Sequence, residues 1–456
     1  MSAALDARAK QLLPDGVPLR RHDAAVFDLR RRRDAAVAQL PDFEALRAHA
    51  EAIKAHTLDH LDTYLERFES QARAAGAVIH WAEDGAAHNR IVYELLEQRG
   101  VRQVVKSKSM LTEECGLNPY LEVRGVEVVD SDLGERIVQL GHELPSHIVV
   151  PAVHRSREEI AALFHAHMGT PRGESDPARL TEHARHALRP RFLAAEAGIT
   201  GVNFAVAETG TIVVCTNEGN ADLGMALPPL HIACMGIEKV IPTLGDLATM
   251  LRLLARSATG QPITAYTSLV TGPRADGELH IVLVDNGRSR LLASATHRKS
   301  LACIRCGACL NTCPVYRFAG GQAYAQAVAG PIGAVLAPAL QSGTEAKRLP
   351  RASTLCGSCS AVCPVRVNLR DQLLAWRRSE ARPTGGQRMF LRLAAAMLAG
   401  PARFRAAGRL GRLLWPLLGR RWRGNPAGAW LEGRELPLHP GASFRARYRR
   451  LRGSRA

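Results

Sequence analysis

The sequence lacks the motifs that mark the common nucleotide and hydrolase sites. No G-x-G-x-x-G, no G-x-x-x-x-G-K-[ST] and no G-x-S-x-G occurs in its 456 residues. A dinucleotide site, a P-loop and the serine elbow of the α/β hydrolases therefore have no support in the sequence. The first ten residues also lack the apolar run of a secretory signal, so we expect a cytoplasmic protein.

Lysine and acidic residues are scarce in the last part of the chain. From Trp376 to Ala456 there are 19 Arg, no Lys and three acids, which accounts for +16 of the net charge of +17. The chain is thus a nearly neutral body with a basic tail, and we expect its prolines to limit that tail to short helices.

Two roles are open for the tail. One is a solvated extension. The other is a docking arm for an acidic partner or an anionic membrane surface, which would place the protein at the inner face of the membrane. A third function, nucleic-acid binding, would fit the tryptophans that lie among the arginines, which are Trp415, Trp422 and Trp430. No nucleic-acid-binding fold supports it.

Charge is absent from a second stretch, Phe318 to Thr344, which is 27 residues long. Its length allows a membrane span, but seven Gly and Pro residues interrupt it. We therefore predict a packed, turning segment.

Apolar runs that alternate with helical patterns occupy the middle of the chain. Strands are predicted at 77–80, 101–106, 126–129, 148–150, 203–207, 211–215, 231–235, 240–241 and 280–284, and helices at 87–99, 158–168 and 246–256. This alternation predicts a mostly parallel sheet with helices on its faces. Residues 1–72 read as helices, with a start signal at Pro41-Asp42.

Three polar loops could bind a ligand beside this sheet. They are Val104–Met110, Glu208–Thr211 and Asn217–Asn220. The first follows a strand, where open α/β sheets form their ligand crevice, and Lys106 and Lys108 could hold a carboxylate or phosphate. Each loop could equally be a turn with a capping residue.

Cysteine is concentrated in one region, with seven of ten residues between Cys303 and Cys363. Cys303, Cys306, Cys309 and Cys313-Pro314 form the C-x2-C-x2-C-x3-C-P run of bacterial ferredoxins. Three closely spaced thiolates can wrap one iron–sulfur cube while the fourth points to a second cube. Zinc sites usually pair two C-x2-C units, so the spacing favours iron–sulfur clusters.

A second run, Cys356, Cys359 and Cys363-Pro364, has Ser353 where a first cysteine would stand. The crossed pattern assigns Cys303, Cys306, Cys309 and Cys363 to a [4Fe–4S] cluster, and Cys313, Cys356 and Cys359 to a second cluster. The second site is [4Fe–4S], with Ser353, a partner or solvent at its fourth corner, or it is [3Fe–4S].

Several stretches resemble the lactate utilisation protein B family, the iron–sulfur subunit of a bacterial L-lactate-oxidising system. They include both cysteine runs and the segments 56–62, 105–110, 131–135, 145–148, 201–210, 216–220, 236–240 and 330–333. The resemblance implies a lactate-utilisation (LUD) body with a fold like those of sugar-phosphate isomerases and CoA transferases, and a helical two-cluster ferredoxin-like domain. It also implies electron carriage during the oxidation of L-lactate to pyruvate, with companion lactate-utilisation subunits and an electron acceptor that the sequence does not identify.

These observations predict four parts and two alternative functions. The parts are a helical segment at 1–72, the α/β LUD domain at 73–292, the two-cluster domain at 293–382 and the basic tail at 383–456. The favoured function is an electron-transfer subunit without a catalytic residue of its own. The alternative is an enzyme for an anionic metabolite, in which Lys106, Lys108 and Glu208 act and the clusters are structural or regulatory.

Overall fold

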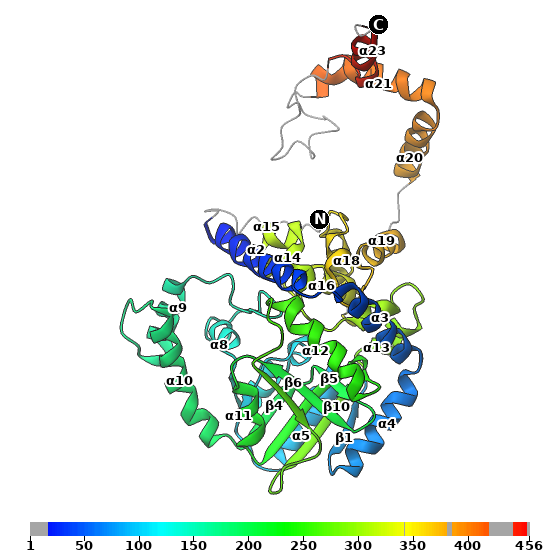
Figure 1. Cartoon of the computed structure of the whole chain (residues 1–456). Helices are drawn as coiled ribbons and strands as arrows, with labels where there is room; N and C mark the ends of the chain where they lie inside the picture. The colour runs from blue at the N-terminus through cyan, green and yellow to red at the C-terminus, as the bar shows by residue number, and fades with distance from the viewer. Residues whose placement is uncertain (1–16, 342, 381–384, 419–440, 454–456) are drawn as a thin grey trace. The chain divides into compact units, whose positions relative to one another are not determined.

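The computed structural model describes residues 17–341, 343–380, 385–418 and 441–453 (Figure 1). The chain divides into two compact units, Met1–Glu380 and Ala381–Ala456. The predicted α/β body and the helical cysteine domain both lie in the first unit, and most of the basic tail forms the second.

A six-stranded parallel sheet forms the centre of the first unit. Its order is β1-β10-β7-β4-β2-β3. The strands are β1 (Val78–Ala82), β2 (Gln103–Lys106), β3 (Glu127–Asp130), β4 (Ala197–Gly201), β7 (Leu230–Gly236) and β10 (Glu278–Val284). Every residue of β7 is buried, as expected where helices cover both faces of a parallel sheet. The predicted parallel sheet is confirmed.

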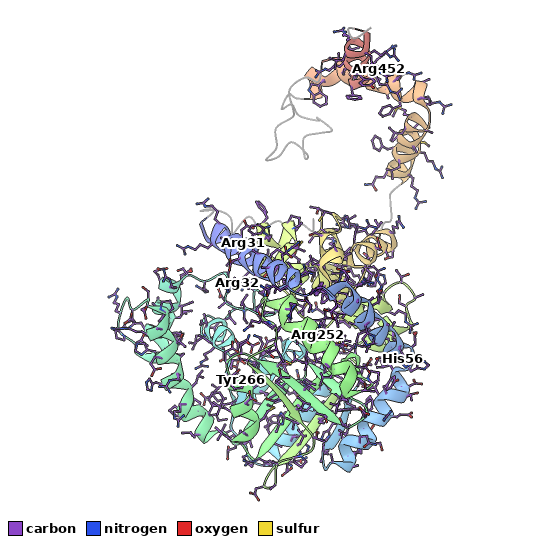
Figure 2. The ribbon with its side chains drawn as sticks, in the orientation of Figure 1. Arg31, Arg32, His56, Arg252, Tyr266 and Arg452 are labelled. Carbon is purple, nitrogen blue, oxygen red and sulfur yellow. The ribbon has the colours of Figure 1, made fainter. Side chains whose placement is uncertain are left out.

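A second, smaller sheet has the order β8-β5-β6-β9. Its strands are β5 (Phe204–Val206), β6 (Thr211–Thr216), β8 (Val240–Ile241) and β9 (Tyr266–Val270), and Tyr266 at the start of β9 is labelled in Figure 2. The tight turn between β5 and β6 contains Gly210 at φ +67°. A Cβ there would lie 2.3 Å from the backbone nitrogen of Ala72, so only glycine fits. The sequence did not separate this sheet from the first, and it missed both β9 and the central strand β4 of the first sheet.

Capping side chains start most helices around the sheets. Asp84, Ser109, Asp132, Ser156, Asp176 and Thr243 each accept a hydrogen bond from a backbone N–H of the following first turn. The helices of this region are α5 (Gly85–Glu97), α6 (Met110–Cys115), α7 (Leu117–Glu122), α8 (Leu133–Leu140), α9 (Arg157–Met168), α10 (Pro177–Ala194), α11 (Asn220–Ala226), α12 (Leu244–Ala258) and α13 (Arg288–Ala293). The three helices predicted in this region correspond to α5, α9 and α12.

The strand predicted at 148–150 is wrong, because this segment has no strand partner in the structure. A side chain accepts the hydrogen bonds that a neighbouring strand would otherwise accept. The backbone N–H groups of Val149 and Val150 donate to Nδ1 of His147 at 3.0 and 3.3 Å. Nε2 of His147 lies 2.9 Å from Oδ1 of Asn311, so the segment is attached to the cysteine-rich domain rather than to the sheet.

The cysteine-rich domain is helical. Its elements are η2 (Arg298–Ala302), α14 (Ala308–Thr312), α15 (Pro314–Ala319), η3 (Gln322–Tyr324), α16 (Gly330–Leu340), α17 (Thr344–Arg348), η4 (Leu349–Arg351), α18 (Ser358–Val362) and α19 (Leu369–Glu380). Residues 330–337 of α16 are all buried, and a Cβ on Gly333 would lie 1.7 Å from the Val328 carbonyl oxygen. The uncharged stretch is therefore a packed core segment, as predicted. None of the described helices is long and apolar enough to cross a membrane.

The N-terminal helices connect the α/β body to the cysteine-rich domain. They are α2 (Val17–Ala38), α3 (Phe43–Asp59) and α4 (Leu61–Ala74). The helix α2 packs on α14 and α15, and α4 packs on β1 and β8. Asp42 occupies the predicted start of α3. Its carboxylate pairs at 3.1 Å with Arg252 of α12, which is labelled in Figure 2.

The second unit contains three described helices, α20 (Gly385–Leu398), α21 (Pro401–Leu418) and α23 (Phe444–Gly453). The prediction of short helices is wrong for α21, which has 18 residues. Pro401 begins this helix instead of breaking it, because the first helical position needs no N–H donor. Trp422 and Trp430 lie outside the described residues.

Candidate iron–sulfur sites and an adjoining cavity

Four cysteines from the two motifs line one small cavity. They are Cys303, Cys306 and Cys309 of the first motif and Cys363 of the second. Apolar side chains complete the lining, including Ile304, Ile332, Val365, Val367 and Leu369. This is the set predicted for the first cluster. Four soft sulfur donors in an apolar shell fit a [4Fe–4S] group, and no group of three His, Cys, Asp or Glu among the described residues is placed to hold a single ion.

The other three cysteines form a second, more exposed group. Cys356 is exposed, whereas Cys313 and Cys359 are buried. Burial raises the pKa of Cys359 to about 11, with smaller contributions from the neighbouring Cys313 and Cys356. The three thiols are thus close enough to influence one another, as the predicted second cluster requires.

Burial also governs the thiols of the first group. It raises the pKa of Cys363 to about 11 and raises the pKa values of Cys306 and Cys309 as well. Iron binds thiolates, so loading this site would release protons and compensate for the unfavourable burial of negative charge.

Two arginines from the N-terminal helices contact the end of the second motif. Arg47 donates to the carbonyl oxygen of Cys363 at 2.8 and 3.0 Å and to that of Ala361 at 2.9 Å. Arg33 donates to the carbonyl oxygen of Val362 at 3.2 Å. These contacts fix the backbone that carries Cys363. No sequence pattern indicates these contacts, because they join residues more than 300 positions apart.

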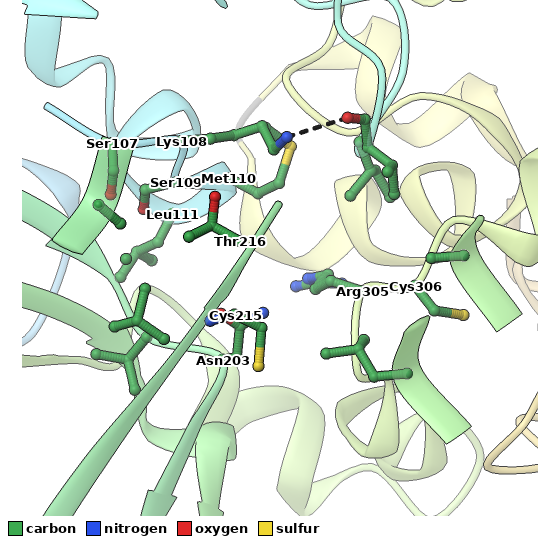
Figure 3. A pocket seen from close by; sticks show the side chains of 18 of the residues that line it. Ser107, Lys108, Ser109, Met110, Leu111, Asn203, Cys215, Thr216, Arg305 and Cys306 are labelled. Carbon is green, nitrogen blue, oxygen red and sulfur yellow. Dashed lines mark hydrogen bonds between the residues drawn. The ribbon is translucent and has the colours of Figure 1, made fainter. Parts of the chain in front are cut away.

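A larger cavity, of about 240 Å³, lies beside the first group (Figure 3). Loops at the carboxyl ends of β2, β4 and β7 form one part of its wall, with Ser107–Leu111, Gly201–Asn203 and Cys234–Gly236. Arg305 and Cys306 of the first cysteine motif form another part. The crevice expected at the ends of the strands is therefore present, and the cysteine-rich domain lines it.

The structure separates the three residues of the alternative enzyme function. Lys106 is fully buried outside this cavity, where its ammonium lies 2.7 Å from Asp130, 3.1 Å from Glu113 and 3.8 Å from Glu135. Glu208 is exposed in the β5–β6 turn and accepts from the Leu244 backbone at 3.1 Å, so it caps α12. A catalytic role for these two residues is not supported, because Lys106 is enclosed by carboxylates and Glu208 lies outside the cavity lining.

Lys108 does line the cavity, together with Asn217, Glu218 and Asn220 of the third candidate loop. Its ammonium lies 3.0 Å from Asp132 and donates to the Val149 carbonyl oxygen at 3.0 Å, the contact drawn in Figure 3. The first bond connects the loop after β2 to the N-cap residue of α8, and the second connects it to the segment at 148–150. Lys108 therefore holds the cavity wall as well as contributing charge to it.

Charged residues that the sequence analysis did not select also surround the cavity. The buried Arg288 pairs with Glu114 at 2.9 Å and with Glu238 at 2.6 Å. Burial lowers the pKa of Lys239 to about 8, although Glu238 opposes the shift. Only the segment 236–240, quoted above for its family resemblance, pointed to this region.

Comparisons with known proteins agree with this two-part arrangement. Residues 65–291 match the LUD domain model, and residues 299–367 match the model of a 4Fe-4S dicluster domain. Lactate utilization protein B of Shouchella clausii is 44% identical over 383 residues, which cover 82% of this chain and 80% of that protein. Lactate utilization protein B of Geobacillus thermodenitrificans is 40% identical over 433 residues, 92% of this chain and 90% of that protein. A solved DUF162 family structure from Deinococcus radiodurans is 15% identical with a TM-score of 0.28, and it covers 49% of this chain and 98% of that chain.

Proposed function

We propose, for a chain that belongs to the lactate utilization protein B family, that it relays electrons through two clusters during the oxidation of L-lactate to pyruvate. Membership of the family and the 4Fe-4S dicluster domain give it a role in lactate utilisation and iron–sulfur electron transfer. Companion lactate-utilisation subunits would supply the oxidising centre, since removal of hydride from a 2-hydroxy acid normally needs a flavin or nicotinamide. This chain has no recognisable motif for either cofactor.

One observation carries the proposal. Cys363 lines the same cavity as Cys303, Cys306 and Cys309 although at least 54 positions separate it from them. The crossing of one cysteine between two motifs is the arrangement of two-cluster ferredoxins. A [4Fe–4S] cluster at this site and a [4Fe–4S] or [3Fe–4S] cluster held by Cys313, Cys356 and Cys359 would supply one-electron transfer.

The surroundings of the two groups indicate which of them contacts a partner protein. The first group adjoins the cavity of the α/β body, whereas Cys356 of the second group is exposed. An exposed ligand brings a redox centre near a partner at the protein surface. We therefore assign contact with an external donor or acceptor to the second group.

The test uses the chain with its companion subunits, purified without oxygen. Iron counting should give seven or eight irons per chain, and adding L-lactate should reduce the clusters, as followed by EPR. About four irons, or zinc in their place, would contradict the two-cluster proposal. A complex that binds lactate but stays oxidised would contradict the role in lactate oxidation.

The alternative function, an enzyme for an anionic metabolite, is favoured by the cavity and its lining Lys108. It predicts turnover of such a metabolite by the isolated chain when all seven motif cysteines are replaced by serine and the fold is retained. Loss of all turnover in a folded variant of this kind would reject it.

We assign the tail to an anionic membrane surface at the cytoplasmic face. In α20, Met389, Phe390 and Leu393 are more than half exposed, and arginines lie between such apolar residues. Apolar and cationic groups on one helix suit the boundary of anionic lipids. The full chain should sediment with anionic vesicles at low salt and be released at high salt, whereas a chain truncated after residue 384 should stay in solution with both clusters intact. Equal binding to neutral vesicles, or none, would contradict this role, and capture by an acidic companion subunit alone would replace it.

A further inference from the structure

The cavity between the α/β body and the first cysteine motif has the size of a small-metabolite site. Its volume of about 240 Å³ lies below the range of roughly 300–1,000 Å³ for drug-sized ligands. A dinucleotide or an acyl-CoA is therefore too large to be enclosed here. The cavity lies at the carboxyl ends of parallel strands, where ligands bind in this class of fold.

The charges around the cavity leave donor groups of two cationic side chains available to a ligand. The lining carboxylates are already engaged: Arg288 pairs with Glu114 and Glu238, and Lys108 pairs with Asp132. The more exposed carboxylate of Glu218 accepts from the Thr216 hydroxyl at 2.9 Å. By contrast, within the described part of the chain, Lys239 forms no ion pair and Nη1 of Arg305 is buried without a hydrogen-bond partner.

Arg305 is directed into the cavity by an unusual backbone. Its φ is +61°, a left-handed conformation that non-glycine residues seldom adopt. Its side chain is only 12% exposed, and Nη2 lies 3.6 Å from Glu238. Figure 3 shows the guanidinium pointing into the cavity while the sulfur of the adjacent Cys306 points the other way. A buried N–H without a partner costs free energy, which a bound anion would offset.

We propose that this cavity binds a small carboxylate, a 2-hydroxy or 2-oxo acid anion, between Arg305 and Lys239. The choice of acid rests on the proposed function in lactate utilisation. The planar guanidinium suits a carboxylate, and Thr216 and Asn203 line the same cavity and carry polar groups for the substituent on carbon 2. The chain would thus hold the substrate or product of its system beside the first cysteine group.

The position of Arg305 gives the site a second property. It stands between Cys303 and Cys306, so an anion bound to it lies near the first group of thiolates. Negative charge there disfavours a further electron, and by linkage reduction should weaken anion binding. Carboxylate binding is expected to lower the reduction potential of the first cluster while leaving the second unchanged.

The experiment measures binding to the isolated, cluster-loaded chain by calorimetry, with L-lactate and pyruvate as probes and inorganic phosphate and propionate for comparison. Lactate or pyruvate should bind more tightly than propionate, because only they carry a polar substituent on carbon 2. No binding of any carboxylate would overturn the site while leaving the test on the whole complex unaffected. Tighter binding of phosphate than of both acids would assign the cavity to a phosphate ligand and equally overturn it.

Variants identify the contacts. Arg305→Gln and Lys239→Gln should each weaken binding about tenfold to a hundredfold, and Arg305→Lys should weaken it less than Arg305→Gln. Arg298→Gln is the matched control, since this arginine lies shortly before the first motif and pairs with Asp59 at 2.8 Å, outside the cavity lining. Iron content checks that Arg305→Gln keeps its clusters, and Lys239→Gln tests the site if it does not. Unchanged affinity in Lys239→Gln and in an iron-loaded Arg305→Gln would overturn the assignment.

A second inference concerns the missing cysteine, and it rests on the likeness of the two motif backbones. Arg305 and Leu355 have φ values of +61° and +58°, and the glycines two positions later, Gly307 and Gly357, have +77° and +86°. Each motif then continues into a five-residue helix, α14 or α18, that ends at a Cys-Pro. The two loops therefore place their residues at matching positions.

Ser353 occupies the position of Cys303 in this match. The Leu355 N–H donates to Oγ of Ser353 at 3.1 Å, just as the Arg305 N–H donates to Sγ of Cys303 at 3.4 Å. We infer that Oγ of Ser353 is the fourth ligand of the second cluster and makes it [4Fe–4S]. The hydroxyl would lose its proton to solvent as the oxygen–iron bond forms, giving a harder donor than thiolate.

Iron counting and EPR of the purified chain test this ligand. Wild type should hold eight irons, and Ser353→Cys should keep eight with a changed spectrum of the second cluster only. Ser353→Ala should fall to seven irons or show a [3Fe–4S] signal. Ser379→Ala, which removes an exposed hydroxyl bonded to the Trp376 carbonyl of α19, is the control and should match wild type. A Ser353→Ala protein with wild-type iron content and spectrum would overturn the assignment.

Discussion

The two cysteine motifs have nearly the same backbone but different surroundings. The first motif lies under α2 and beside the α/β body, and its Cys306, Cys309 and Cys313 are buried. The second begins at the exposed Cys356, and its other two cysteines, Cys359 and Cys363, are buried. The difference shows that the same ligand spacing can serve an interior site and a surface site, depending on which elements of the chain cover it.

The largest difference in stability is expected when one cysteine of each group is replaced. Cys309→Ala should destabilise the protein by about 4 kcal/mol, or roughly 10 °C in Tm, because a buried site loses its cluster and the packing around it. Cys356→Ala should lose only the second cluster and a smaller part of this stability. Calorimetry of iron-counted samples measures both. Equal loss of Tm in the two variants would contradict the contrast.

A smaller effect is expected from the arginines that cover the motifs. Arg47→Met leaves the carbonyl groups of Ala361 and Cys363 without their charged donor, which should cost about 2 kcal/mol of unfolding free energy. Arg366→Met, the control, removes an exposed pair with Glu44 and should cost less than about 1 kcal/mol. Urea unfolding of the cluster-loaded proteins measures the loss of unfolding free energy in each variant. An equal or larger loss in Arg366→Met would contradict the contribution of Arg47.

Lowering the pH should decrease the free energy of unfolding through His147, which lies beside the first motif. Burial lowers the pKa of His147 to about 3 from its ordinary 6.5, so the unfolded chain takes up a proton before the folded chain does. Stability from this group is complete above pH 6.5 and falls as the pH drops toward 3, by about 1 kcal/mol at pH 5.5. Urea unfolding at pH 7.5 and 5.5, compared between wild type and His147→Gln, measures the difference. A variant with the same pH dependence as wild type would assign the acid sensitivity elsewhere.

The smallest predicted difference is kinetic. A chelator with a mild oxidant should remove the second cluster several-fold faster than the first, because solvent reaches Cys356 directly. EPR distinguishes the clusters during the reaction. Removal of both at one rate would mean that the two sites open together.

Much of the fold could be predicted from the sequence because its signals are local. Buried apolar runs marked the strands β1, β2, β3, β7 and β10, and Asp42 marked the start of α3. The prediction failed at 148–150, where an apolar triplet resembles a strand but its backbone donates to His147. Periodicity cannot detect a side chain that takes the place of a strand partner.

The candidate sites were predictable to different degrees. The cysteine grouping followed from spacing alone, since the crossed pattern of two-cluster domains is a rule of sequence. The roles of Lys106 and Lys108 could not be separated, because both follow β2 and only packing places one against three carboxylates and the other at the cavity. Arg47 and Arg305 were missed because their partners are distant in sequence or depend on a left-handed backbone.

The contact between Arg47 and Cys363 also sets the order in which the protein can be assembled. It joins two residues 316 positions apart, and the four cysteines proposed for the first cluster lie at both ends of the interval between Cys303 and Cys363. A growing chain on the ribosome has no complete set of these cysteines until Cys363 has been synthesised. Iron delivery to the proposed site would then be a late event, and Arg47 reaches its final contacts only when almost the whole first unit has been made.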